Sequence, residues 1–304
     1  MAGGHQHSHQ ANKKALLVSF CLMTVYMIVE ALGGFLTHSL ALLSDAGHML
    51  SDAVALFVAL VALKIGEKAA TNHKTFGYKR FEVLAALFNG AALLIISLFI
   101  IIEAIERFFH PGGVRAGGML TVAAFGFLVN LAAAFILTNK KDNINIRAVF
   151  LHVMGDLLGS LAAIIAAILI LLLNWTLADP ISSLVVSVLI LISGFRVTKD
   201  AVHVLMEGVP LGVNLDEVIE TIQSVPDVQG LHDLHIWSIT SGSNALSCHV
   251  VVGDLITLEE GQQILRRIEE RLEQLGIQHT TIQLELDSHP HGNSVLCSIH
   301  QSRE

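Results

Sequence analysis

Long apolar stretches alternate with short polar breaks over the first 200 residues of the chain. A helix needs about 17 to 25 mainly apolar residues to cross a bilayer, and six stretches reach that length. The breaks between them contain residues that favour turns, such as His110-Pro111-Gly112-Gly113. The pattern predicts an α-helical membrane protein with six transmembrane helices. These lie at Ala15–Gly34, Leu40–Leu63, Val83–Ile105, Gly117–Leu137, Ala148–Leu173 and Ile181–Val197.

Beyond residue 200 charged residues become frequent, and the hydrophobic pattern is typical of a soluble domain. The spacing predicts a helix, two strands, a second helix and a third strand. This αββαβ order fits an α+β domain with two helices on one side of a three-stranded sheet. The elements are expected at Leu215–Val225, Val228–Ile239, Ala245–Val252, Leu258–Leu275 and Thr280–Leu286.

The basic residues indicate the orientation, because Lys and Arg gather in cytoplasmic loops. One side of the predicted helices carries only Arg107 and Arg115, and the other side carries many more, so both termini are expected in the cytoplasm. We expect a His-containing cytoplasmic tail over residues 1–14, a transmembrane domain over 15–200, a cytoplasmic domain over 201–288 and a flexible tail over 289–304. The basic residues of the cytoplasmic side are Lys13, Lys14, Lys64, Lys68, Lys74, Lys79, Arg80, Lys140, Lys141, Arg147, Arg196 and Lys199.

The composition agrees with a membrane protein. Of the 304 residues, 53% are hydrophobic and 14% are charged, against about 25% charged in an average soluble domain; the mean hydropathy is +0.64. A net charge of −8 and scattered basic residues argue against nucleic-acid binding. Cys21, Cys248 and Cys297 are too few and too widely spaced for a disulfide framework. Residues 1–14 lack the apolar core of a signal peptide, so we expect the first helix to remain as an anchor.

Two of the apolar stretches contain the same short motif, a histidine followed four residues later by an aspartate. The pairs are His48 with Asp52 and His152 with Asp156. Side chains at i and i+4 share one face of a helix, so two such helices side by side supply four ligands suited to a tetrahedral Zn²⁺ site. One pair alone could be a satisfied polar contact. The repetition favours a metal site, because ionisable residues at membrane depth are usually functional.

Seven separated motifs resemble, in the same order, those of the cation diffusion facilitator family in its zinc-type branch. Within that branch the chain is similar to the bacterial cobalt–zinc–cadmium resistance exporters. The resemblance covers the whole chain except its two tails. The motifs are Ser39–Asp52, Phe76–Glu82, His152–Ser160, Asp179–Ile181, Leu205–Pro210, His232–Trp237 and His279–Glu285.

This resemblance implies a homodimer that exports Zn²⁺ from the cytoplasm, in exchange for protons, across the inner (plasma) membrane. Cd²⁺ and Co²⁺ are further candidate substrates. The cytoplasmic domain is expected to have a ferredoxin-like fold of the metallochaperone kind. The expected partners are therefore these metal ions, H⁺, the lipid bilayer and a second copy of the chain, with no nucleic acid.

By the same resemblance, the transported ion binds midway through the membrane at the two His/Asp motifs. Two carboxylates would cancel the charge of the dication, and two neutral imidazoles favour a borderline-soft metal. The same groups also bind protons, so metal binding should expel protons and protonation should expel metal. Asp45 lies three residues before His48 on the same helix face. We expect it to orient the His48 ring or line the ion's entry path.

The resemblance also gives a second set of candidate zinc ligands in the cytoplasmic domain, at the expected dimer interface. Single histidines at strand edges are more often simply solvated, so that alternative stays open for each of them. The candidate ligands are His232, His249, His279 and Glu285.

Two further positions match the family outside the metal sites. Arg80 and Glu207 stand where the family has a cation and an anion that link the third helix to the start of the cytoplasmic domain. In the loop before the third helix, His73 is present but Tyr78 replaces a second histidine. We therefore expect no full metal site in that loop.

The chain is not expected to be an enzyme. A membrane metallohydrolase needs an open coordination position and a general base, and neither His/Asp motif has the His-Glu-x-x-His arrangement that supplies them. The main alternative is a membrane-anchored metal sensor, for which the intramembrane ligands would be dispensable. A channel is a further alternative, and it would pass current without proton dependence.

Overall fold

The computed structural model describes residues 4–66, 68–110, 112–138, 144–240, 242–254, 256–288 and 294–296. Within these ranges the side chains of residues 4–20, 55–56, 59–60, 63, 137–138, 144–149 and 151–152 are not described. The expected His-containing tail, 1–14, therefore lies outside the described side chains. Of the expected flexible tail, 289–304, only residues 294–296 are described.

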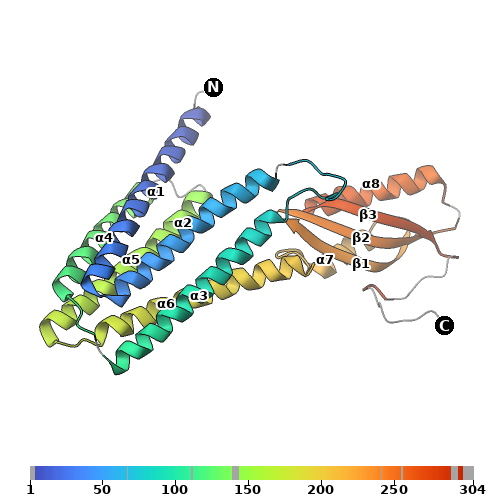
Figure 1. The fold of residues 1–304 in the computed structure, drawn as a ribbon. Helices are drawn as coiled ribbons and strands as arrows, with labels where there is room; N and C mark the ends of the chain where they lie inside the picture. Colours follow the sequence, from blue (N-terminus) through green and yellow to red (C-terminus); the bar gives the residue numbers. More distant parts are fainter. Residues whose placement is uncertain are drawn as a thin grey trace. The chain divides into compact units, whose positions relative to one another are not determined.

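Six long helices occupy the first two thirds of the chain (Figure 1). Four apolar segments are long enough to cross a membrane, and α1 holds a shorter apolar segment, Cys21–Thr37; this count covers the described residues only. The prediction of a helical membrane domain is therefore confirmed. The four segments are Phe81–Phe109, Ala116–Ile136, Val153–Leu173 and Ala178–Leu205. The helices are α1 (Gly4–Thr37), α2 (Leu40–Gly66), α3 (Phe81–Phe109), α4 (Ala116–Thr138), α5 (Ile144–Leu173) and α6 (Ala178–Leu205).

The carboxylate of Asp179, in the first turn of α6, caps the N-terminus of α2. It accepts hydrogen bonds from the backbone amides of Leu40 (2.9 Å) and Ala41 (3.1 Å) and from the Ser39 hydroxyl (2.6 Å). Such amides have no acceptor within their own helix, and a carboxylate also suits the positive end of the helix dipole. The contact fixes the start of α2 beside the start of α6. Because α6 directly follows α5, α2 and α5 run in opposite directions.

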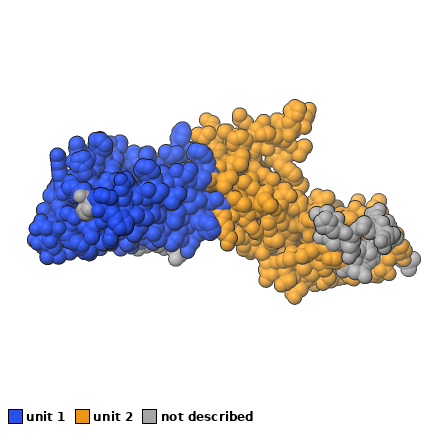
Figure 2. All heavy atoms as spheres, turned by 60° about the horizontal axis from the view of Figure 1, so that its bottom comes forward, with its two compact units in different colours: residues 1–58, 88–198 blue, residues 59–87, 199–304 orange. Residues whose placement is uncertain are grey.

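The chain divides into two compact units (Figure 2). The first consists of residues 1–58 and 88–198, and the second of residues 59–87 and 199–304. The predicted division at residue 200 follows the change in composition. The contacts additionally place the end of α2, the following loop and the start of α3 in the second unit.

Small side chains dominate one core of the first unit. Ala123 and Ala167 are completely buried there. In a bilayer, helices associate through close packing, and small residues let their backbones approach. The cluster includes Ala41 and Leu42 of α2, Ala116, Met119 and Ala123 of α4, and Ala163, Ala166 and Ala167 of α5.

The second unit contains a three-stranded sheet with two helices. The strands lie in the order β1-β2-β3, with β1 and β2 antiparallel and β2 and β3 parallel. The order αββαβ predicted from the sequence is confirmed. The elements are α7 (Leu215–Gln223), β1 (Val228–Thr240), β2 (Ser243–Val252), α8 (Leu258–Gln274) and β3 (Ile277–Leu286).

Both helices of this sheet domain begin at side-chain caps and bury one apolar face. Asn214 caps α7, and Thr257 with Glu260 forms a capping box on α8. The helices share one core with alternate residues of the strands, listed here by element: Val218 and Ile222 of α7, Ile264, Ile268 and Leu272 of α8, and Leu246, Cys248 and Val250 of β2. Burial raises the pKa of the Cys248 thiol to about 12, so this cysteine is a neutral packing residue.

One face of the sheet is therefore covered by helices, and the residues between the core positions point to the other face. On β2 these are the odd-numbered residues Ser247, His249 and Val251, which alternate with the buried even-numbered ones. This second face is called the open face below. Polar residues on three strands can meet there because adjacent strands lie about 4.8 Å apart.

Candidate metal centres

The first candidate centre lies in the first unit, on α2 and α5. His48 and Asp52 lie one helical turn apart on α2, and His48 Nδ1 is 3.5 Å from Asp52 Oδ2. Both side chains are partly buried. The i, i+4 spacing thus brings one imidazole and one carboxylate to the same face, as the sequence predicts.

A close contact fixes how α2 and α5 are aligned. A Cβ built on Gly159 of α5 would lie only 2.9 Å from Oδ1 of Asp45 on α2. Only a glycine leaves room for the carboxyl group at this point. Because the two helices are antiparallel, residues further along α2 lie level with residues further back along α5.

This alignment relates the two His/Asp motifs to one another. Three residues beyond Asp45 is His48, and three residues before Gly159 is Asp156. Asp156 is 2% exposed. The partner of Asp52 in this alignment is the fourth predicted ligand, residue 152, which lies in α5 with a side chain outside the described ones. The geometry of the complete set of four therefore stays a prediction.

Asp45 lies between the two helices of this centre. It is buried, and within the described residues its Oδ2 makes no hydrogen bond. A neighbouring buried carboxyl group belongs to Glu30 on α1, which accepts a 2.6 Å hydrogen bond from the Tyr26 hydroxyl. Tyr26 is a polar residue of this region that was not predicted from the sequence. The spacing could have predicted this contact, because a tyrosine four residues before a glutamate lies on the same face of a helix.

The second candidate centre lies on the open face of the sheet in the second unit. The strand register places His232 of β1 opposite His249 of β2. On β3, Glu285 pairs with Val251, one step further along the same face. One ligand atom from each of these three residues lies within 4.8 Å of the others, and this is the only such group of three or more His, Cys, Asp or Glu among the described residues. We call it the cytoplasmic triad.

The distances within the cytoplasmic triad are short. His232 Nε2 and Glu285 Oε2 form a 2.9 Å hydrogen bond. His249 Nδ1 lies 2.8 Å from Glu285 Oε1, and it makes no hydrogen bond within the described part of the chain. A buried ring nitrogen without a hydrogen bond, next to a carboxylate, is what a metal ion needs. Two imidazoles and one carboxylate are also a donor set of the kind that Zn²⁺ takes.

The charge of Glu285 follows from its surroundings. Burial by itself raises the pKa of this carboxyl group, but the hydrogen bond with His232 and the nearby His249 outweigh burial and leave the pKa below its ordinary value. Glu285 is therefore ionised at neutral pH. An ionised carboxylate between two imidazoles is an acceptor ready for a cation.

The register separates His279 from the cytoplasmic triad. His279 pairs with Ala245, four residues along β2 from His249, which is about 13 Å at the rise of a strand. Its ring lies edge-on to Phe76, with the centroids 5.7 Å apart. Within one chain this register keeps His279 apart from the other three predicted ligands, so its place in a site at the expected dimer interface stays a prediction. The physical reason is that six residues of extended chain separate it from Glu285.

A β-bulge in β1 changes the face of the residues that follow it. Between His232 and His235, three steps along β1 oppose two steps along β2. Strict alternation would put these two histidines on opposite faces. The extra residue brings His235 back to the open face, opposite Ser247. Alternation in the sequence cannot show a bulge, and Asp233, which lies in it, was missed for that reason.

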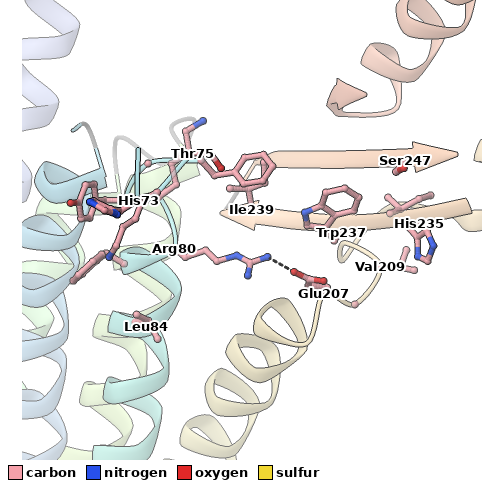
Figure 3. Close-up of a pocket in the computed structure, with 18 of the residues that line it drawn as sticks. His73, Thr75, Arg80, Leu84, Glu207, Val209, His235, Trp237, Ile239 and Ser247 are labelled. Atoms are coloured by element: carbon pink, nitrogen blue, oxygen red, sulfur yellow. Dashed lines mark hydrogen bonds and ion pairs between the residues drawn. The ribbon is translucent and has the colours of Figure 1, made fainter. Parts of the chain in front are cut away.

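Arg80 and Glu207 form an ion pair within the second unit. Arg80 Nη2 lies 3.1 Å from Glu207 Oε1, and the two side chains face one another in Figure 3. They line a cavity of about 830 Å³ together with His73, Trp237 and His235. The side chains are 40% and 63% exposed, so the pair itself stabilises the fold only slightly.

Two family models match the chain. Residues 16–206 match the model of the cation efflux transmembrane domain, and residues 210–287 match that of the cytoplasmic domain of cation efflux proteins. The first match alone covers more than half of the 304 residues.

Curated relatives align along nearly the whole chain. A cadmium, cobalt and zinc/H(+)-K(+) antiporter of Bacillus subtilis (strain 168) is 57% identical over 297 residues, which cover 97% of this chain and 96% of that protein. The zinc transporter ZitB of Escherichia coli (strain K12) is 40% identical over 292 residues, 92% of each chain. The metal cation efflux system protein CzcD of Cupriavidus metallidurans is 38% identical over 289 residues, 94% of this chain and 91% of that protein.

Among solved structures, the metal-bound C-terminal domain of the CzcD transporter from Cupriavidus metallidurans matches 24% of this chain and 100% of its own. The sequence identity is 40% and the TM-score is 0.23.

Proposed function

Because the chain belongs to the cation efflux family, the cation diffusion facilitators, we propose that it exports Zn²⁺ from the cytoplasm in exchange for protons. Relatives along the whole chain are named as metal transporters and antiporters, so the protein is a metal-cation transporter rather than an enzyme. The names of the Bacillus relative's substrates suggest Cd²⁺ and Co²⁺ as further cargo and K⁺ as a second counter-ion.

The transported ion would bind at the four residues of the two His/Asp motifs. The observation that carries this proposal is the close contact of Asp45 with Gly159, because in an antiparallel pair it aligns His48 with Asp156. Asp52 then aligns with His152. The proposal thus rests on one helix contact and on the repeated spacing of the motifs.

The composition of this site accounts for exchange. Two carboxylates offset the charge of a dication in a medium where an uncompensated charge is costly. Histidine has an ordinary pKa of about 6.5, so an imidazole can release a proton when the ion arrives and take one up when it leaves. Export then requires only that the helices open the site to one side of the membrane at a time.

We further propose six transmembrane spans, formed by α1 to α6, with both termini in the cytoplasm. The excess of Lys and Arg on one side supports this orientation. The membrane we propose is the inner (plasma) membrane. The cytoplasmic domain would be ferredoxin-like, and two copies of the chain would assemble through it.

The cytoplasmic triad would hold a resident Zn²⁺. His232, His249 and Glu285 fit such an ion, because the His249 Nδ1 is a buried ring nitrogen without a hydrogen bond beside a carboxylate. When bound, the ion would cross-link three strands that are far apart in the sequence. It would take no part in moving the transported ion through the membrane.

Transport by purified protein in sealed vesicles tests the main proposal. A zinc-sensitive dye inside the vesicles reports flux under an imposed proton gradient, for the wild type, for Asp156→Ala and for Asp200→Ala as control. Asp200 is an exposed aspartate near the end of α6. We expect gradient-driven flux in the wild type and the control, and none in Asp156→Ala.

Zinc flux at the wild-type rate in Asp156→Ala would show that the ion binds elsewhere. Zinc flux in the wild type that does not depend on the proton gradient would contradict antiport. It would not contradict the proposed binding site.

A further inference from the structure

Asp233 is the residue of β1 that lies in the bulge beside the cytoplasmic triad. We propose that Asp233 is a positioning residue that holds the His249 ring by its Nε2, so that Nδ1 faces the bound metal ion. This inference rests on the proposed resident zinc at the triad, and it goes further by naming the nitrogen of His249 that binds and the group that selects it.

The backbone of Asp233 points to a specific role. Its φ is +52°, in the left-handed region that few residues other than glycine adopt readily. Aspartate and asparagine enter this region more easily than other residues with a side chain. This conformation occurs in the bulge between His232 and His235, where two residues of β1 face one of β2. Bulges commonly redirect a side chain next to a functional site.

The carboxylate of Asp233 lies between two imidazoles. Its Oδ2 is 3.9 Å from His249 Nε2, and its Oδ1 is 3.5 Å from His235 Nε2. Both distances are longer than a hydrogen bond. A small shift of the half-exposed Asp233 side chain would bring its Oδ2 within hydrogen-bond distance of His249 Nε2. His235 then holds the other oxygen of the same carboxylate, which limits its rotation.

The two nitrogens of His249 face different partners. Nδ1 lies 2.8 Å from the Glu285 carboxylate without a hydrogen bond, and Nε2 faces Asp233. A neutral imidazole carries its proton on one nitrogen and a lone pair on the other, and the hydrogen bond of one nitrogen decides which is free for a metal. A carboxylate at Nε2 keeps the proton there. Nδ1 is then left with the lone pair, on the side of the triad.

Carboxylate–histidine–metal arrangements of this kind orient the ring and increase its strength as a ligand, and their loss typically lowers metal affinity about 10- to 100-fold. Asp233 would therefore act on the metal through His249 without binding it. It would also keep the ring from turning over, which would present Nε2 to the triad instead.

The test uses the full-length protein in detergent, with Asp156→Ala added to remove binding at the membrane site. Two substitutions separate the carboxylate from the backbone. Asp233→Gly tolerates the positive φ and removes the acceptor, and Asp233→Asn tolerates the positive φ and keeps an acceptor oxygen. Asp227→Gly is the matched control, because Asp227 is an exposed aspartate with φ +72° in the same unit.

Affinity for Zn²⁺ is measured by competition with a chelating dye, and the ligand arrangement by the visible absorption of bound Co²⁺. We expect Asp233→Gly to bind Zn²⁺ about 10- to 100-fold more weakly and to change the Co²⁺ spectrum. Asp233→Asn should recover most of the affinity and the wild-type spectrum. Asp227→Gly should match the unsubstituted protein in both measurements.

Affinity of Asp233→Gly within twofold of the control, or an equal loss in Asp233→Asn and Asp233→Gly, would overturn the inference. The proposed zinc site itself is tested separately by His249→Ala. If the parent protein binds no more Zn²⁺ than His249→Ala does, the triad is not a metal site, and Asp233 has no metal ligand to position.

Discussion

The two candidate metal centres use similar ligands on different scaffolds. In the first unit, the ligands come from two helices in which each pair is local, four residues apart in the sequence. In the second unit, the cytoplasmic triad is assembled from three strands, with ligands at positions 232, 249 and 285. The first centre can change by the movement of one helix against another. The second is tied together by the hydrogen bonds of a sheet.

The two centres also differ in the number of carboxylates that they contain. The proposed membrane centre would combine two histidines with two carboxylates, which match the charge of a dication. The cytoplasmic triad has two histidines and one carboxylate, on a face that is partly open to water. We therefore propose that similar ligands let an ion pass in one place and retain it in the other.

Reciprocal substitutions give the largest expected effects and test whether the centres are separate. Asp52→Ala should lower zinc flux in vesicles at least about 100-fold, because it removes both a ligand and a compensating charge. Glu285→Ala should lower Zn²⁺ affinity at the cytoplasmic triad by a similar factor and reduce flux much less. Flux assays on both variants, with binding measured in parallel, decide this. Equal loss of flux in the two variants would mean that the centres work as one.

A pair of glycine substitutions tests the alignment of α2 with α5. Gly159→Ala places a Cβ 2.9 Å from Asp45 Oδ1, so the helices must shift. We expect a loss of about 1–3 kcal/mol in stability together with reduced flux. Gly155→Ala, four residues earlier on α5, meets no atom within 4 Å among the described residues and is the control. Thermal unfolding in detergent and vesicle flux measure the two effects, and similar behaviour of both variants would contradict the alignment.

The pH dependence of the stability of the folded protein tests the cytoplasmic triad in the absence of metal. The pKa of Glu285 is lowered in the folded protein. A carboxyl group of this kind stabilises the fold fully above its unfolded-state pKa, about 4.3, and the stabilisation is lost as the pH falls through the lower folded-state pKa. With chelator present, the unfolding midpoint of the wild type should fall toward that of Glu285→Gln as the medium is acidified. A constant difference between them across acidic pH would exclude this linkage.

The smallest effect is expected at the ion pair between Arg80 and Glu207. Both side chains are more than a third exposed, so a double-mutant cycle with alanine should give a coupling free energy below about 1 kcal/mol. Denaturation of the four proteins measures it. A larger reduction of flux than of stability in Arg80→Ala would assign the pair to transport rather than to folding.

Local patterns were enough to predict the helices and the His/Asp motifs. The apolar runs gave the membrane helices, and the i, i+4 spacing gave the pairing of His48 with Asp52, because both depend on neighbours within one helix. The order of elements in the cytoplasmic domain also followed from periodicity. The alignment of α2 with α5 was not predictable, since it depends on the fit of Asp45 against Gly159 from another part of the chain.

Strand register is the feature of the second unit that local sequence patterns show least. His279 was grouped with the triad because it stands in the same motif as Glu285, yet the pairing of β3 with β2 places it four residues of β2 away from His249. Simple alternation along β1 would put His235 on the face opposite to that of His232. The bulge at Asp233 reverses that assignment, and nothing in a single sequence marks a bulge whose residue is an aspartate.

The carboxylate of Asp179 makes α2 a lever with a fulcrum at its first residues. His48 lies eight residues from that fulcrum and Asp52 twelve, or about 12 and 18 Å at 1.5 Å per residue. A tilt of about 10° at the fulcrum would carry His48 through about 2 Å and Asp52 through about 3 Å. A zinc–nitrogen bond is itself only about 2 Å long. A small rotation of a single anchored helix would therefore be sufficient to make or break this half of the proposed coordination sphere.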